Sequence, residues 1–177
     1  MIKTKNILAN TLINMLKDKE YKNITITDIA LKANINRSTY YRNFSTKDEV
    51  ITFYFSNILK EFLKKIDEEN EIFENYIKIL FTHYFDYKEE LILIYKNELF
   101  FLFLKSLKKI LEIKNFKHLN IDSYYKIQYH SGGIYNFFSF WISRGMIEPP
   151  EKISEIALSF YPDELKKLSL FKFLQQK

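Results

Sequence analysis

Hydrogen-bonding side chains cluster between residues 36 and 47 of this 177-residue chain. If residues 37–44 form a helix, side chains four positions apart share a stripe on its surface. One stripe, Tyr40 with Phe44, is aromatic and is predicted to face inward. The other three stripes are rich in hydrogen-bonding groups: Arg37 and Tyr41, Ser38 and Arg42, Thr39 and Asn43. Such a surface suits a polar partner, because a guanidinium group can bind a phosphate or a guanine edge through two parallel hydrogen bonds.

The placement of the arginines supports this interpretation. The chain has three arginines and 24 lysines, and two of the arginines, Arg37 and Arg42, lie in this segment. An isolated pair of arginines could equally be two solvated surface charges. Here the pair follows a helix and a tight turn and lies on a polar helix face, which favours DNA recognition.

Two short helices and a turn must position these side chains. Thr25 is predicted to cap the first helix, and Asp28 lies three residues later in the spacing of a capping box. Asn34 ends this helix, since asparagine tolerates the left-handed backbone that a tight turn requires. Asn36 is a suitable N-cap for the second helix. The buried face of the first helix is predicted to contain Ile29, Ala30 and Ala33.

Residues 25–50 resemble the DNA-binding signature of the TetR family of transcriptional regulators. That family shows the pattern T-x-x-x-I-A-x-x-A-G-V-S-x-x-T-x-Y-x-x-F-x-x-K-E-x-L. The chain follows its order and spacing at Thr25, Ile29, Ala30, Ala33, Ile35, Thr39, Tyr41, Phe44 and Lys47. Asn34 replaces the usual turn glycine and Asn36 replaces the usual serine cap, and both residues can perform the same task.

The resemblance implies an all-α fold, with a three-helix DNA-binding head in residues 1–47 and a helical effector-binding and dimerisation domain in residues 48–177. It also implies a homodimer that binds a palindromic double-stranded DNA operator and responds to an unidentified small-molecule effector, more often as a repressor. The expected DNA-binding residues are Thr27, Arg37, Ser38, Thr39, Tyr41, Arg42, Asn43 and Lys47.

Two further helices frame the helix–turn–helix. The first is predicted over residues 4–17, with its buried face formed by Ala9, Leu12, Ile13 and Leu16. The second begins at Thr46, where Thr46 and Glu49 have capping-box spacing, and runs to about Ile66. Lys47 lies in its first turn, where a positive side chain and free backbone N–H groups could bind a phosphate.

Composition restricts the class of protein. The chain is 47% hydrophobic and has no cysteine, so it can form neither disulfides nor a thiolate metal site. Its formal charge is +5, and residues 1–50 hold nine Lys and Arg against five Asp and Glu, so the basic excess lies near the helix–turn–helix. The longest apolar run, residues 99–104, is too short for a membrane span, and no signal peptide is recognisable. We therefore expect a cytoplasmic protein.

Residues 71–175 carry helical rather than alternating apolar spacing, which predicts helices at about 71–86, 88–96, 98–114, 121–144, 151–160 and 164–175. Their many aromatic residues could line a ligand pocket or simply fill a core. The candidate pocket residues are His83, Tyr95, Phe103, Tyr129, His130 and Phe137. Residues 132–145 are similar to the penultimate helix of one TetR C-terminal subtype, which pairs across a dimer. The candidate interface residues are Gly132, Gly133, Phe140 and Trp141.

Two alternatives remain. An enzyme is disfavoured, because the sequence has no H-x-x-x-H or H-E-x-x-H spacing, no G-x-S-x-G motif and no glycine-rich phosphate loop. We therefore predict no catalytic residue, no metal site and no cofactor. The stronger alternative is a TetR-like activator or coactivator whose C-terminal domain binds a protein partner instead of a small molecule.

Overall fold

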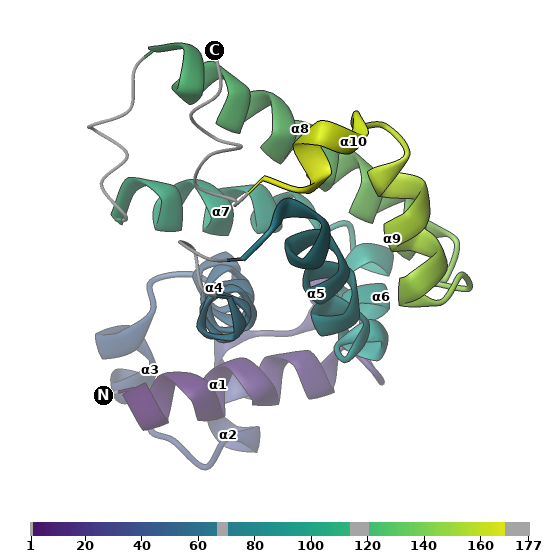
Figure 1. Cartoon of the computed structure of the whole chain (residues 1–177). Coiled ribbons are helices and arrows are strands. Elements are labelled where there is room, and N and C mark those ends of the chain that lie inside the picture. Colours follow the sequence, from purple (N-terminus) through teal and green to yellow (C-terminus); the bar gives the residue numbers. More distant parts are fainter. Residues whose placement is uncertain (1, 67–70, 114–120, 169–177) are drawn as a thin grey trace. The chain divides into compact units, whose positions relative to one another are not determined.

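The computed structural model of the chain describes residues 2–66, 71–113 and 121–168 (Figure 1). These residues form helices and no β-strand, which confirms the predicted all-α fold. None of the helices in these ranges combines the length and apolarity needed to cross a bilayer.

The helices group into two compact units. Unit 1 comprises residues 1–58 and 89–110, and unit 2 comprises residues 59–88 and 111–177. The division therefore falls inside α4 (Lys47–Lys65) and α7 (Phe101–Ile113), and after the first residue of α6 (Lys88–Lys96). A division at residue 47 into a DNA-binding head and an effector domain stays a prediction about function.

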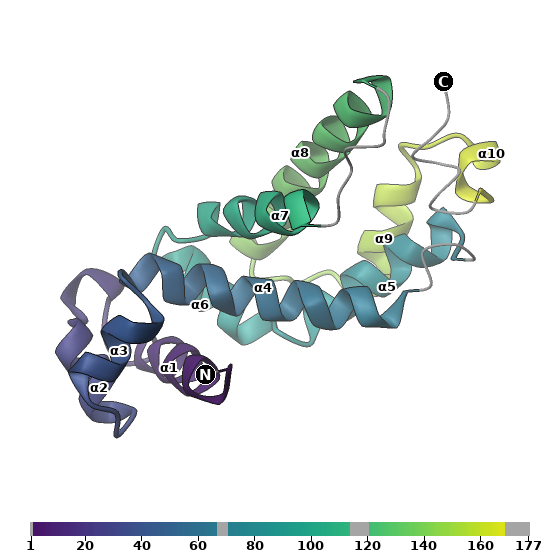
Figure 2. The same cartoon turned by 90° about the vertical axis from the view of Figure 1, so that its left-hand side faces the viewer.

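Unit 1 is built on α1 (Ile2–Met15), a short 3₁₀ turn η1 (Tyr21–Asn23), α2 (Ile26–Lys32) and α3 (Arg37–Asn43). These three α-helices pack against one another beside the first turns of α4 (Figure 2). The unit also includes most of α6 (Lys88–Lys96) and the first part of α7. The apolar faces meet in a core of Leu8, Leu12, Ile13, Ile29, Tyr40, Val50, Phe55, Ile94 and Phe103. The periodicity of the sequence thus identified the buried face of α1, although η1 was not predicted.

Unit 2 contains the rest of α4 together with α5 (Phe73–Phe85), α8 (Ile121–Ser143), α9 (Pro150–Leu158) and α10 (Asp163–Lys166). Helix α5 packs against α9. Aromatic rings contact one another throughout this unit, and some pairs are stacked: the ring centres of Phe81 and Phe138 lie 4.9 Å apart, and those of Phe85 and Trp141 lie 5.9 Å apart. The helix predicted over 164–175 reaches only Lys166 in α10, and residues 169–175 lie outside the described ranges.

Candidate DNA-binding surface

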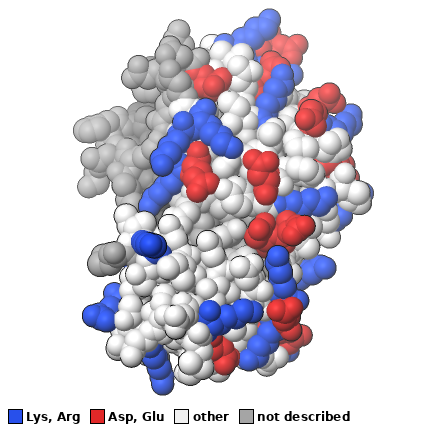
Figure 3. Space-filling model, turned by 90° about the horizontal axis from the view of Figure 1, so that it is seen from below, with Lys and Arg blue, Asp and Glu red and all other residues white. Residues whose placement is uncertain are grey.

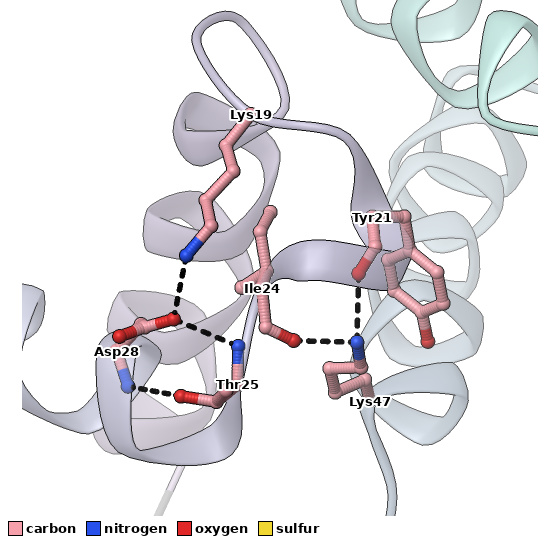
Figure 4. A network of polar contacts seen from close by, with 6 residues as sticks. All are labelled: Lys19, Tyr21, Ile24, Thr25, Asp28 and Lys47. Carbon is pink, nitrogen blue, oxygen red and sulfur yellow. Dashed lines mark hydrogen bonds and ion pairs between the residues drawn. The ribbon is translucent and has the colours of Figure 1, made fainter.

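The start of α2 has the predicted capping box. The Asp28 backbone N–H donates to Thr25 Oγ1 at 3.0 Å, and the Thr25 N–H donates to Asp28 Oδ2 at 2.9 Å. Lys19 also binds Asp28 Oδ2, at 3.0 Å (Figure 4). The Thr25 backbone bond and then the Lys19 bond favour the carboxylate and lower the pKa of Asp28 to about 2. The first helix of the motif therefore has a fixed start.

The turn between α2 and α3 also follows the sequence. Asn34 adopts a positive φ of 52°, the left-handed conformation for which asparagine was predicted. Asn36 Oδ1 then accepts the Ser38 backbone N–H at 2.9 Å, so Asn36 is the N-cap of α3. Asn34 and Asn36, the two residues that depart from the TetR pattern, therefore both have backbone conformations that asparagine adopts readily.

The aromatic stripe of α3 anchors this helix in unit 1. Tyr40 is fully buried and Phe44 is 4% exposed, as predicted. The Tyr40 hydroxyl donates to the Thr46 carbonyl at 3.1 Å, and burial raises the pKa of Tyr40. Because these two side chains fix the inward face of α3, the opposite face must point to solvent.

Intrahelical bonds order the outward face of α3. Arg37 Nη2 donates to the Tyr41 hydroxyl at 3.2 Å, and the Arg37 guanidinium carbon lies 5.5 Å from the Tyr41 ring centre. Arg42 Nη2 donates to Thr39 Oγ1 at 2.7 Å. The predicted residues on this face are exposed or half-buried: Arg37, Ser38, Thr39, Tyr41, Arg42 and Asn43. Both guanidinium groups are thus held on the helix surface while most of their donors remain available.

The other two predicted contact residues lie outside α3. Thr27 is exposed in the first turn of α2. Lys47 instead directs its ammonium group inward, donating to the Tyr21 carbonyl at 2.7 Å and the Ile24 carbonyl at 2.5 Å (Figure 4). The group also lies 4.2 Å from the Tyr21 ring centre, and burial lowers the pKa of Lys47. Lys47 therefore fastens the segment before α2, and its contact with a phosphate stays a prediction.

Sequence reasoning missed Tyr21, the partner of Lys47. Its hydroxyl donates to the Asp48 carboxylate, so both first residues of α4 hold this tyrosine. Burial and then the Asp48 bond raise the pKa of Tyr21. The available signal was weak: a single aromatic residue in a short polar segment, more than 20 residues before its partners.

Net charge alone does not mark a binding surface. Figure 3 shows the face at the bottom of Figure 1, where Lys and Arg side chains alternate with Asp and Glu. Lysines close to the helix–turn–helix also form exposed ion pairs, Lys32 with Asp18 and Lys22 with Glu20. The candidate site is therefore defined by the arrangement of side chains on α3 and not by charge alone.

The candidate pocket residues are divided between the two units. In unit 1, Tyr95 and Phe103 both contact Phe100, with ring centres 6.2 and 5.3 Å apart. In unit 2, His83 is buried beside Phe62, at 5.8 Å. Among the described residues no group of three or more His, Asp or Glu side chains could hold a metal ion.

The other three pocket candidates lie on α8. Phe137 contacts Phe81 at 5.5 Å, and His130 Nδ1 lies 3.1 Å from the Tyr161 hydroxyl. Tyr129 is 79% exposed. Tyr129 therefore lies on the exposed surface of α8 in the described part of the chain. An effector pocket formed by the six candidate residues stays a prediction.

The candidate interface residues on α8 separate into two groups. Phe140 is 67% exposed, and a Cβ added at Gly132 or Gly133 would meet no atom within 4 Å. Trp141 corrects the prediction, because it is only 1% exposed and its Nε1–H donates to the Glu148 carbonyl at 3.1 Å. Trp141 is a core residue of unit 2. Tyr125, which the sequence analysis did not select as an interface residue, is 68% exposed on the same helix.

Comparisons with known proteins agree with this geometry. No protein-family model matches the chain. The chain is 26% identical over 120 residues to the HTH-type dhaKLM operon transcriptional activator DhaS of Lactococcus lactis subsp. lactis (strain IL1403), a match that covers 65% of this chain and 53% of that protein. It is 35% identical over 52 residues to the uncharacterized HTH-type transcriptional regulator YxbF of Bacillus subtilis (strain 168), covering 29% of this chain and 14% of that protein.

A solved structure of the dihydroxyacetone kinase operon activator DhaS superimposes with a TM-score of 0.60, at 19% identity, over 94% of this chain and 98% of that one. This likeness shows the fold. The chain spans about half the length of DhaS and a seventh of YxbF in the sequence matches, and both relatives are HTH-type transcriptional regulators. Together with the helix–turn–helix geometry, they support a DNA-binding transcriptional regulator.

Proposed function

We propose that this chain regulates transcription by inserting α3 into the major groove of an operator. The observation that carries this proposal is the two-sided construction of α3, with Tyr40 fully buried and two arginines held on the exposed face. In the groove, Arg37 and Arg42 can each donate two hydrogen bonds to a guanine edge, which discriminates between bases. Ser38, Thr39 and Asn43 supply shorter hydrogen-bonding groups beside them.

We further propose that two copies of the chain bind a palindromic operator, because one helix of this length reads too few base pairs for useful specificity. The exposed face of α8 supports the dimer. Large apolar side chains are exposed along it at Ile121, Tyr125, Tyr129 and Phe140. Gly133 shares this face, is exposed, and has no neighbour within the chain that requires a glycine. A glycine in a helix costs about 1 kcal/mol relative to alanine, so close approach of a second helix explains its presence.

We also propose that an effector alters DNA affinity through α4. This helix contributes to both units, with Lys47 and Asp48 beside the segment before α2 and Phe62 in the core of unit 2. A ligand acts only through its differential affinity for two states, and a coupling of about 1–3 kcal/mol changes operator affinity roughly 5- to 150-fold. The TetR resemblance favours a repressor that responds to a small molecule.

An activator is the second candidate, and a specific observation favours it. DhaS, which matches this chain in sequence and in structure, is named an operon activator. In that case unit 2 would bind a protein partner through its exposed aromatic side chains. Co-purification of a partner would support this candidate, and a thermal shift with a metabolite would support the small-molecule effector.

The DNA-binding proposal is tested by selecting double-stranded DNA from a random library with the purified chain. We expect enrichment of an inverted repeat, and fluorescence anisotropy should give a specific affinity at least about 1,000-fold tighter than that for unrelated DNA. Light scattering should give a dimer at micromolar concentration. A pool that enriches no sequence would contradict the proposed function.

A further inference from the structure

The segment before α2 is tied to α6 as well as to α4. The Tyr21 backbone N–H donates to Asn97 Oδ1 at 2.8 Å, although the two residues are 76 positions apart in the sequence. On the other side of the same residue, the Tyr21 carbonyl accepts from Lys47 and the Tyr21 hydroxyl donates to Asp48. All four residues belong to unit 1. The short turn that leads into the helix–turn–helix is therefore held by the end of α6 and by the start of α4.

The end of α6 has the geometry needed to hold Asn97 in place. The Glu98 N–H donates to the Tyr95 carbonyl at 2.9 Å, and the Leu99 N–H donates to the Ile94 carbonyl at 3.1 Å. These two bonds form a Schellman motif, in which Asn97 is the C-cap and Glu98 takes the left-handed conformation, with φ 61°. The Asn97 side chain is fixed further, because its Nδ2 donates to the Leu93 carbonyl at 2.9 Å.

A non-glycine residue in the left-handed conformation is unfavourable and persists only where surrounding contacts require it. The buried side chains of Ile94 and Leu99 supply such contacts, at 0% and 5% exposure. The backbone and side chain of Asn97 are therefore both held in place, and its amide oxygen accepts the Tyr21 N–H. Because the donor is a backbone group, this bond fixes the position of the main chain at residue 21 and does not depend on the side chain there.

We propose that Asn97 is a positioning residue for DNA binding, which sets the orientation of α2 and α3 relative to α6. This inference rests on the proposed function. In a dimer on a palindrome, the orientation of each helix–turn–helix determines the separation of the two recognition helices, and hence the half-site spacing that the protein accepts. A displacement of α6 relative to α4 would act on the Tyr21 segment from both sides, so the same contact would transmit a movement of α6 to the DNA-binding helices.

The test compares Asn97→Ala with Asn97→Asp, which keeps the acceptor oxygen, and with Lys96→Ala, an exposed neighbour. Each protein is titrated with the selected operator and with operators whose half-sites lie one base pair closer or further apart. We expect Asn97→Ala to bind the selected operator about fivefold more weakly, the loss typical of one hydrogen bond. We also expect it to lose most of its discrimination between spacings, whereas Lys96→Ala keeps its discrimination and Asn97→Asp, which keeps the acceptor for Tyr21 but loses the donor to Leu93, loses less than Asn97→Ala.

Hydrogen exchange provides an independent readout. Amides of residues 20–24 should exchange faster in Asn97→Ala than in the wild type, with α1 and α5 unchanged. A general loss of stability would instead weaken binding to all spacings in parallel and would overturn the proposal. So would an Asn97→Ala protein with wild-type spacing preference and exchange. A wild-type protein that binds no DNA would contradict the proposed function itself, and this inference with it.

Discussion

Lys47→Met tests the role of the ammonium group that binds the segment before α2. Methionine retains most of the aliphatic stem of lysine but cannot donate to the Tyr21 and Ile24 carbonyls, which accept from Lys47 at 2.7 and 2.5 Å. Ile24 is 1% exposed, so water cannot readily replace the lost donor at that residue. The Tyr21 carbonyl keeps the Ile24 N–H as a second donor, at 3.2 Å, and so loses less.

Hydrogen bonds from charged groups contribute roughly 1.5–3 kcal/mol each, and partial solvent access reduces this value. Deleting both Lys47 bonds should therefore lower the free energy of unfolding by about 2 kcal/mol, equivalent to about 4–8 °C in Tm for a chain of this size. The control is Lys32→Met, because Lys32 forms an exposed ion pair with Asp18 at 4.0 Å, and its loss should change the free energy of unfolding by less than about 0.5 kcal/mol.

Urea unfolding followed by circular dichroism measures both variants. We expect a lower midpoint for Lys47→Met with an unchanged slope, and a wild-type midpoint for Lys32→Met. Equal midpoints for all three proteins would refute the internal role of Lys47. The salt dependence of operator binding tests the predicted phosphate contact separately: if Lys47 also contacts a phosphate, the slope becomes smaller by about one in Lys47→Met, and an unchanged slope would limit Lys47 to its internal role.

Three further results are expected. Asn34→Ala should destabilise the chain by about 1 kcal/mol in urea while Asn34→Gly should not, because φ at this residue is 52°; equal losses would refute this. The pKa of Asp28 is lowered to about 2, so the stabilisation by its carboxylate is present above about pH 4 and is lost as pH falls towards 2; urea midpoints of Asp28→Asn should therefore change less than those of the wild type between pH 5 and 2.5. Gly133→Phe should give a folded monomer by light scattering and circular dichroism, since a Cβ there meets no atom within 4 Å of its own chain; a persistent dimer would contradict the proposed interface.

The local features of the helix–turn–helix could be predicted because they depend on residues two to four positions apart. The Thr25–Asp28 capping box, the Asn34 turn and the Asn36 cap are all set by such short spacings. The inward direction of Tyr40 followed equally from helical periodicity. Each of these predictions needed no knowledge of the rest of the chain.

Features that depend on distant packing could not be predicted. Trp141 and Phe140 are neighbours in a helix with aromatic residues on several sides, and periodicity did not show which of the two would be buried. The sequence around Lys47 does not show whether its ammonium group binds a phosphate or the carbonyl of Tyr21, 26 residues earlier. The tie between Tyr21 and Asn97 spans 76 positions and left no pattern that the sequence alone could reveal.

The central claim, that α3 reads DNA, is tested most directly by replacing the arginines one at a time. The chain provides its own control in Arg144, the third arginine, which pairs with Glu148 at 3.2 Å in the segment between α8 and α9. On the operator selected by the wild type, we predict that Arg37→Ala and Arg42→Ala each weaken binding by about 1–3 kcal/mol and relax base preference at the contacted position. Arg144→Ala should bind as the wild type does. Wild-type affinity and base preference in both α3 variants would contradict the claim.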